Sequence, residues 1–363
     1  MTADRRPNLL AAALPIVAIV VFVLTVAGIV WSAGSTLGYD FHAYESAARR
    51  ILDGQRLYDP AVDVAGGFAI YLYPPPFALA IVPLAIIGGQ AAVGIWTGLM
   101  SAAFVGGIAL LPVSRTVRWL VLLLGAIDWP VLYSIKLGQV GPILFLLFAI
   151  GWRWLDRPGR LGAAIGLGTI VKLQPGLLVG WAALTGRRRA IGIALAVIAV
   201  GAIVATVAAG TQPWVDYPGL LGRVSSPLTT PHNFTPGAVA FQAGVPLTAA
   251  SVIQWASVVL ALVAVVVAAR TAAPDASYLV AVVASQLLSP LLWDHYAMLL
   301  LLPTAWLLAR RQWWAIAIPL STALPLIGIV PPAVYPIMFV ACLLALLAVG
   351  SPRGRAMALD SAR

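Results

Sequence analysis

Polar side chains that could do chemistry are few in this chain, and the first group of them lies at residues 38–45. This stretch holds Asp40, His42 and the only glutamate of the sequence, Glu45. An aspartate can act as a general base that takes a proton from a reacting hydroxyl group. It is also a favoured cap at the start of a helix, and Asp40 considered alone fits either role. We interpret Glu45 as a solvated charge of a loop.

The second group surrounds Lys172. The chain has two lysines, Lys136 and Lys172, and both lie between apolar segments instead of beside the arginines. Ionisable side chains inside a membrane are costly and usually functional, although a lysine can also snorkel toward the headgroups. Gln174 and Pro175 follow Lys172 and break a short apolar segment. We therefore predict that Lys172 neutralises an anion such as a lipid phosphate.

The third group, residues 289–296, interrupts an apolar region near the C-terminus. It contains Trp293, Asp294 and His295. A histidine can donate to a phosphate or carry a proton near neutral pH, and we favour such a role for His295. The alternative interpretation of this stretch is an aromatic belt at the membrane interface. Further polar candidates are His42, Gln139, His232 and Asn233.

The composition that surrounds these groups predicts an all-α polytopic membrane protein. The 363 residues are 61% hydrophobic and 9% charged, whereas a soluble domain carries about 25% charged residues. Runs such as 9–30, 190–209 and 251–269 are long enough to cross a hydrocarbon core about 30 Å thick. The first run lacks a convincing cleavage site, so we interpret it as an anchor and not as a signal peptide.

The arginines predict how the chain is oriented. Arg5 and Arg6 precede the first span, and most other arginines lie at the ends of apolar segments, which gives the net charge of +10 without indicating nucleic-acid binding. If these basic groups are cytoplasmic, the segments between them must form hairpins whose tips lie near Gln139, Lys172 and His295. The scheme gives about twelve transmembrane helices, with both termini cytoplasmic.

Some arms of these hairpins are too short to cross the membrane. Residues 161–171 make about 16 Å of helix, roughly half of the hydrocarbon core. Polar hairpin tips at such depth are tolerated only where they line a cavity within the protein. We therefore predict a cavity that opens to the outer side.

Two outer loops complete the predicted organisation. Outer loop 1, at 32–75, contains an amphipathic helix at 39–53 that we expect to lie on the membrane surface. Residues 77–87 are apolar but short, and they either span the membrane or lie at its outer interface; 91–111 then crosses it. Outer loop 2 is at 210–247. Residues 1–350 form a single transmembrane domain, and 351–363 a cytoplasmic tail.

Several enzyme classes are excluded by the motifs that the sequence lacks. It has no phosphate-cradling Gly-Lys-Ser/Thr loop, no His-Glu-x-x-His zinc motif and no Gly-x-Ser-x-Gly nucleophile motif. Cys342 is the only cysteine and cannot form an internal disulfide. An enzyme that uses nucleotide sugars would need a cytoplasmic domain, which is absent, so a donor delivered within the membrane fits better.

The ordered motifs resemble those of the polytopic GT-C glycosyltransferases. More specifically, the chain looks like the bacterial family of polyprenol-phosphate-mannose-dependent α-mannosyltransferases. The similar pieces, in chain order, are Tyr39-Asp40-Phe41-x-x-Tyr44, Gly54-x-x-x-Tyr58, Tyr73-Pro74-Pro75-Pro76-Phe77, Gly138-Gln139, Lys172-Leu173-Gln174-Pro175 and Ser289-Pro290-x-x-Trp293 with His295 and Tyr296.

This resemblance implies a GT-C-type bundle with juxtamembrane helices at the outer face of a bacterial plasma membrane. It implies inverting transfer of a mannosyl residue from a polyprenyl-phosphate donor to a glycolipid or lipoglycan acceptor, without a metal or other cofactor. Asp40 would be the general base, although many GT-C enzymes carry a second, adjacent carboxylate in this loop that is missing here. Lys172 and His295 would face the donor phosphate. The residues expected to bind substrate are Tyr44, Gln139, Gln174, Trp293 and Asn233.

Two other functions stay open at this point. One is a transferase that uses another prenyl-phosphate sugar, such as arabinofuranose. The other is a transporter of lipid-linked sugars, which would share the cavity and the intramembrane charges but would show inverted repeats. The motifs do not distinguish the donor sugar, the acceptor, the linkage or the oligomeric state.

Overall fold

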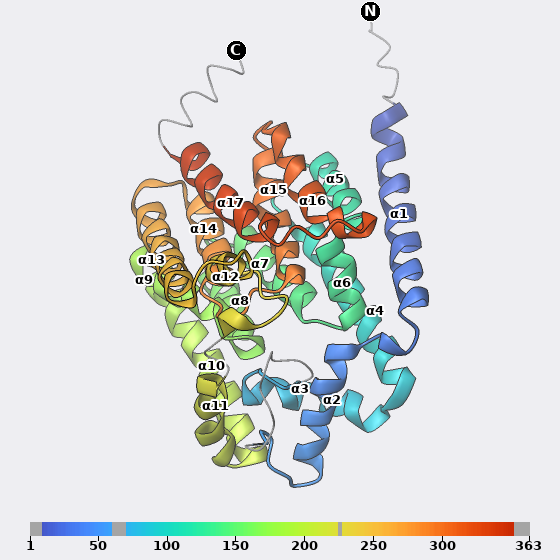
Figure 1. Ribbon diagram of the computed structural model, residues 1–363, viewed down its shortest axis with the longest axis vertical. Coiled ribbons are helices and arrows are strands. Elements are labelled where there is room, and N and C mark those ends of the chain that lie inside the picture. Colours follow the sequence, from blue (N-terminus) through green and yellow to red (C-terminus); the bar gives the residue numbers. More distant parts are fainter. Residues whose placement is uncertain (1–8, 60–69, 224–226, 352–363) are drawn as a thin grey trace, which may run out of the picture.

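The structure, a computed structural model, describes residues 9–59, 70–223 and 227–351. These residues form helices joined by loops, with no strand among them (Figure 1). In chain order the α-helices are α1 (Leu9–Ala33), α2 (Tyr39–Leu52), α3 (Pro75–Ile87), α4 (Gly89–Leu110), α5 (Arg115–Ala126), α6 (Trp129–Leu137), α7 (Gly141–Arg153), α8 (Pro158–Val171), α9 (Leu177–Leu184), α10 (Arg188–Ala209), α11 (Gln212–Arg223), α12 (Pro236–Gln242), α13 (Leu247–Thr271), α14 (Pro274–Leu287), α15 (Leu301–Leu308), α16 (Ala317–Thr322) and α17 (Val334–Gly350). Two short 3-10 helices, η3 (Gln174–Gly176) and η5 (Asp294–Leu300), border the site described below.

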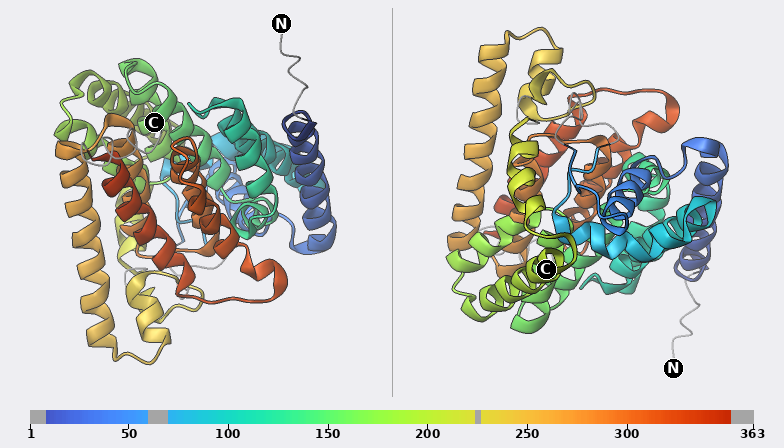
Figure 2. Two further views of the ribbon diagram at one scale, coloured as in Figure 1. Left: turned by 90° about the horizontal axis from the view of Figure 1, so that it is seen from above. Right: turned by 90° about the horizontal axis from the view of Figure 1, so that it is seen from below.

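Four of these helices are long and apolar enough to cross a membrane: α1, α4, α10 and α13. A fifth crossing is possible if α5 and α6, which meet at a bend of 65°, form one broken span. The expectation of an all-α membrane protein is thereby supported, while the number of about twelve spans stays a prediction. Helices α1 and α13 lie at opposite edges of the bundle (Figure 2), and their outward side chains are apolar and exposed, as a lipid-facing surface requires.

The helices predicted from sequence periodicity are present. The amphipathic helix expected at 39–53 is α2, and its buried face carries Phe41, Tyr44 and Ala48. Residues 77–87 belong to α3, whose 13 residues make about 20 Å of helix, less than the hydrocarbon core. Helices α2, α3 and α11 lie together at the end of the bundle opposite the start of α1 (Figure 1). Arg5, Arg6 and the predicted tail beyond residue 351 lie outside the described residues.

The break between α5 and α6 brings two distant segments together. Asp128 lies at the break and Pro130 is in the first turn of α6, where a residue without an N–H group is tolerated. The bend directs the end of α6 toward the start of α2, where the N–H of Gly38 donates to the carbonyl oxygen of Lys136 at 2.8 Å. Gly138 follows in the left-handed region with φ of 71°, which turns the chain sharply after α6.

Helix α8 approaches α10 closely because glycines lie at their crossing. Gly162 and Gly166 lie one turn apart on α8. A Cβ atom at Gly162 would lie 2.5 Å from the carbonyl oxygen of Ala190, and one at Gly166 would lie 2.8 Å from that of Ala194. Small residues at this spacing let helix backbones pack together in membranes. Because α8 ends directly before Lys172, this contact fixes where the lysine lies.

The substitution Gly166→Ala is expected to destabilise the protein, because its new Cβ atom would press on the backbone of α10. Overpacking of this kind costs about 1–3 kcal/mol of unfolding free energy, which a thermal melt in detergent would detect as a lower Tm. The matched control is Gly180→Ala in α9, where nothing lies within 4 Å of the new atom. An equal loss of Tm in both variants would contradict the packing role of Gly166.

Candidate active site

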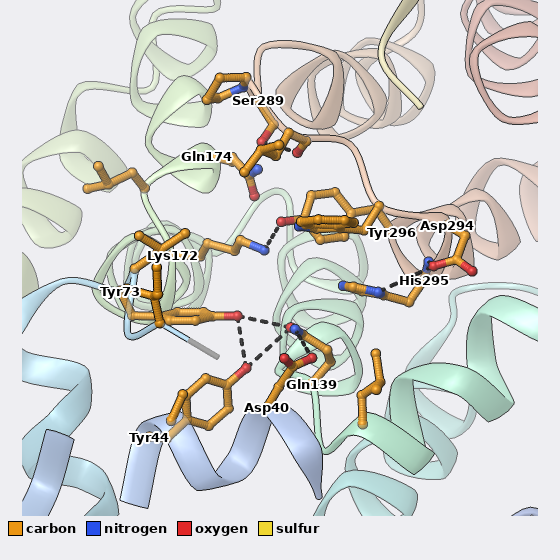
Figure 3. Close-up of a pocket in the computed structure, with 18 of the residues that line it drawn as sticks. Asp40, Tyr44, Tyr73, Gln139, Lys172, Gln174, Ser289, Asp294, His295 and Tyr296 are labelled. Carbon is orange, nitrogen blue, oxygen red and sulfur yellow. Dashed lines mark hydrogen bonds and ion pairs between the residues drawn. The ribbon is translucent and has the colours of Figure 1, made fainter. Parts of the chain in front are cut away.

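A cavity of about 560 Å³ lies where several helix ends meet, a volume usual for small-molecule sites. It is bordered by α2, the extended segment before α3, the turn after α6, the break after α8 and the break before η5 (Figure 3). Seven of the eight residues predicted from the sequence line it: Asp40, Tyr44, Gln139, Lys172, Gln174, Trp293 and His295. The three polar groups that were far apart in the sequence therefore share one cavity.

Asp40 lies in the first turn of α2 but does not cap that helix. The N-cap is Gly38, whose φ of 76° suits a glycine, and no side chain caps the first turn. Instead, Oδ2 of Asp40 accepts a hydrogen bond of 2.5 Å from Nε2 of Gln139. Burial raises the pKa of the Asp40 carboxyl above its ordinary value, while His295, the Gln139 hydrogen bond and Lys172 partly offset this rise.

Gln139 is oriented by two tyrosines. Its Oε1 atom accepts hydrogen bonds from the hydroxyl groups of Tyr73, at 2.9 Å, and Tyr44, at 3.3 Å; the Tyr44 hydroxyl also donates to that of Tyr73, at 2.9 Å (Figure 3). With its oxygen facing these donors, the amide must direct its NH₂ group toward Asp40. Gln139, predicted as a substrate ligand, thus holds Asp40 in place.

Lys172 lies opposite Asp40 in the cavity (Figure 3). It follows the last residue of α8 and its backbone is extended, so the side chain leaves the helix direction. Its ammonium group donates to the hydroxyl group of Tyr296 and lies 5.5 Å from the centre of the Tyr73 ring. Both tyrosines keep the cation within the cavity by hydrogen bonding and by cation–π attraction.

His295 comes from η5, which follows the break after α14. Its exposed fraction is 4%, and neither ring nitrogen has a hydrogen-bond partner among the described residues. The charged group beside it is Asp294, with Oδ1 at 3.6 Å from Nδ1. A buried imidazole without partners, at the wall of a cavity, is placed to meet a polar ligand.

Asn233 is the predicted substrate-binding residue that the structure does not bring to the cavity. It is fully buried; its Nδ2 donates to the carbonyl oxygens of Pro227 and Pro290, each at 3.1 Å. Its Oδ1 accepts from the backbone N–H groups of Thr235 and Leu292. Asn233 thus connects the loop before α12 with the break before η5. No polar atom of its side chain is left for a substrate.

Sequence reasoning assigned no role to several aromatic residues of the cavity. Tyr73 and Tyr296 contact Gln139 and Lys172, and Tyr133 lines the wall next to His295. A signal existed for two of them, because Tyr73 opens the Tyr-Pro-Pro-Pro motif and Tyr296 directly follows His295. Lys136, the second lysine, does not line the cavity.

The model of glycosyltransferase family 87 matches residues 71–293, more than half of the chain. This chain belongs to glycosyltransferase family 87. Membership confirms the predicted class of enzyme, which moves a sugar from a donor to an acceptor. Searches of curated proteins and of solved structures gave no match. In this family 87 protein Asp40 and His295 lie outside the matched residues, whereas Gln139, Lys172 and Trp293 lie within them.

No three His, Cys, Asp or Glu side chains in the described part of this glycosyltransferase cluster as metal ligands would. Its independence of a metal or other cofactor stays a prediction.

Gln139→Leu is expected to shift the acid limb of the pH profile of kcat/KM to higher pH. Asp40 is the predicted general base, and a base works only when ionised, so activity should be lost as pH falls through the pKa of Asp40. The hydrogen bond from Gln139 lowers that pKa, and its removal should raise the pKa further. The matched control is Tyr44→Phe, which removes a hydroxyl group that contacts Gln139 but not Asp40. The acid limb of its pH profile should therefore move less. An unchanged acid limb in Gln139→Leu would contradict the role of Asp40 as base.

Proposed function

We propose that this family 87 glycosyltransferase moves a mannosyl residue from a polyprenyl-phosphate donor to a glycolipid or lipoglycan acceptor, with inversion at the anomeric carbon. Asp40 is the general base, and Lys172 and His295 bind the donor phosphate. The observation that carries this proposal is the placement of Asp40, Lys172 and His295 around a single cavity. These are the charges that an acceptor hydroxyl and a phosphate leaving group need.

The lining of the cavity supports a lipid-linked donor. Leu173, Leu177 and Leu288, the residue that follows α14, line the same cavity as Lys172. Leu173 exposes 46% of its surface, although it sits next to the cation. An apolar surface next to a phosphate-binding lysine suits a phosphate that carries a hydrocarbon chain, whereas a nucleotide would need polar partners for its base and ribose.

The proposed step is a single displacement. The acceptor oxygen attacks the anomeric carbon while Asp40 removes the hydroxyl proton. The bond between that carbon and the phosphate oxygen breaks, and the polyprenyl phosphate leaves with the bonding electron pair and gains one negative charge. Lys172 and His295 stabilise that charge. This stabilisation is strongest in a cavity shielded from water. A β-linked donor gives an α-linked product.

Two features support an assignment to the outer face of the membrane. The arginines favour a cytoplasmic location for the loops between hairpins, and the helices of the two predicted outer loops, α2 and α11, gather with α3 at one end of the bundle (Figure 1). Transfer at the outer, periplasmic face of a bacterial plasma membrane fits both. The transporter alternative loses support from family membership, and a donor panel that includes prenyl-phosphate arabinofuranose separates the sugar alternatives.

The direct test is mannosyl transfer from polyprenyl-phosphate mannose by the purified protein and by Asp40→Asn. We expect the variant to lose about 10²–10⁴-fold in kcat, because a positioned base contributes that much. The matched control is Glu45→Gln on the same helix, whose carboxylate pairs with Arg49 at 2.9 Å and does not line the cavity. Full activity in Asp40→Asn would exclude Asp40 as the base. Transfer from the arabinofuranose donor only would exclude mannose.

Lys172→Met is expected to lower kcat/KM for the lipid-phosphate donor by about 10²–10³-fold, the usual effect of removing one group that stabilises developing charge. The chain offers an internal control, since Lys136→Met removes the other lysine, which lies outside the cavity lining. Donor titrations with both variants measure the difference. Equal kcat/KM values for the two variants would refute phosphate binding by Lys172.

A further inference from the structure

We propose that Asp294 and Trp129 are positioning residues for His295. Asp294 holds the Nδ1 side of the imidazole and thereby directs Nε2 into the cavity, and Trp129 holds Asp294. The inference rests on the proposed function in one respect, because it takes the donor phosphate to be the group that Nε2 meets.

The imidazole of His295 lies between Asp294 and the centre of the cavity (Figure 3). Its Nδ1 atom is 3.6 Å from Oδ1 of Asp294, longer than a hydrogen bond. Such contacts often shorten when substrate binds. The other ring nitrogen points away from Asp294 toward the cavity (Figure 3). A carboxylate in this place favours a hydrogen atom on Nδ1, and a phosphate in front of Nε2 favours one there too, so the imidazolium form fits both neighbours.

The carboxylate is itself held by two other donors. The backbone N–H of His295 donates to Oδ1 at 2.8 Å, and the indole Nε1 of Trp129 donates to Oδ2 at 2.8 Å. Each carboxylate oxygen therefore accepts one hydrogen bond, and Oδ1 also faces the Nδ1 side of the imidazole.

The bend between α5 and α6 explains why a tryptophan from another segment reaches this carboxylate. Trp129 is the first residue of α6, directly after the break. Its ring stacks on that of Tyr133 with centroids 4.6 Å apart, and Tyr133 lies beside His295 with centroids 6.3 Å apart. The first turn of α6 therefore forms a rigid support behind the imidazole.

An asparagine at position 294 would meet a conflict. Its one oxygen can face either the donors on the His295 side or the indole of Trp129, and its NH₂ group must then face a donor. If the amide turns its nitrogen toward His295, Nδ1 must give up its hydrogen atom, which leaves a neutral ring with its hydrogen atom on Nε2. Replacing Trp129 by phenylalanine removes the competing donor, so that the amide oxygen can again accept from the His295 side.

The test combines nitrogen NMR of ¹⁵N-histidine-labelled protein in nanodiscs with the transfer assay. The chain has three histidines, and His295→Gln assigns the signal of interest. We expect both ring nitrogens of His295 to be protonated in the native protein, the neutral Nε2–H form to increase in Asp294→Asn, and the hydrogen atom on Nδ1 to return in Trp129→Phe/Asp294→Asn. In parallel, Asp294→Asn should lose about 10–100-fold in kcat/KM, as orienting partners typically do, and the double variant should recover part of this loss.

Trp119→Phe is the matched control, because the Trp119 indole N–H lies on neighbouring α5 and has no hydrogen-bond partner in the described residues. It should change neither the His295 signal nor transfer. The proposal is overturned if both ring nitrogens of His295 stay protonated in Asp294→Asn, or if the double variant is no better than Asp294→Asn. The NMR signal requires no substrate. A protein that rejects the mannosyl donor but shows the change in ring protonation would therefore refute the proposed function and not the positioning roles.

Discussion

Every helix broken within an apolar bundle frees backbone groups that must find partners inside the protein, and this chain breaks its helices where its polar side chains lie. The turn after α6 is satisfied by α2 and α4: Gly38 donates to the carbonyl oxygen of Lys136, and the indole of Trp96 donates to that of Gly138 at 2.7 Å. The break before η5 is satisfied by Asn233. These contacts join segments far apart in the sequence, and the cavity is the space between them.

The charges in this cavity depend on one another. Burial disfavours the ionised form of Asp40, and a buried carboxylate persists only with hydrogen bonds and opposite charges near it. Gln139 supplies the hydrogen bond, while Lys172 and His295 supply the charge. Tyr73 links both sides, since its hydroxyl group donates to Gln139 and its ring faces the ammonium group of Lys172. This support holds Asp40, the proposed base, at the cavity.

The match to glycosyltransferase family 87 covers Gln139, Lys172 and Trp293 but neither Asp40 nor His295. The proposed base and one proposed phosphate ligand therefore come from segments on either side of the matched region. Their convergence on one cavity is a property of the tertiary structure, and it unites the matched and unmatched parts of the chain in one site.

The sequence by itself determined the class of fold and most of the candidate site residues. Long apolar runs predicted membrane helices, because a helix satisfies its own backbone groups in lipid. The rare lysine, histidine and aspartate residues between such runs were candidate site residues, because isolated charges there are costly. These grounds and the ordered motifs predicted eight site residues, and seven of them line the cavity.

Tertiary structure alone decided the relations between these residues. Local propensity allowed Asp40 as a cap or a base; in the structure Gly38 is the N-cap, and Asp40 contacts Gln139 in the distant turn after α6. The same holds for Asn233, whose polar side-chain atoms are all used by backbone groups of two loops. Trp129 was not among the residues predicted from the sequence, and its contact with Asp294 joins two distant segments. Hydrogen bonds between distant segments leave no periodic or compositional trace, so a single sequence identifies candidate residues but not the partners that give each one its role.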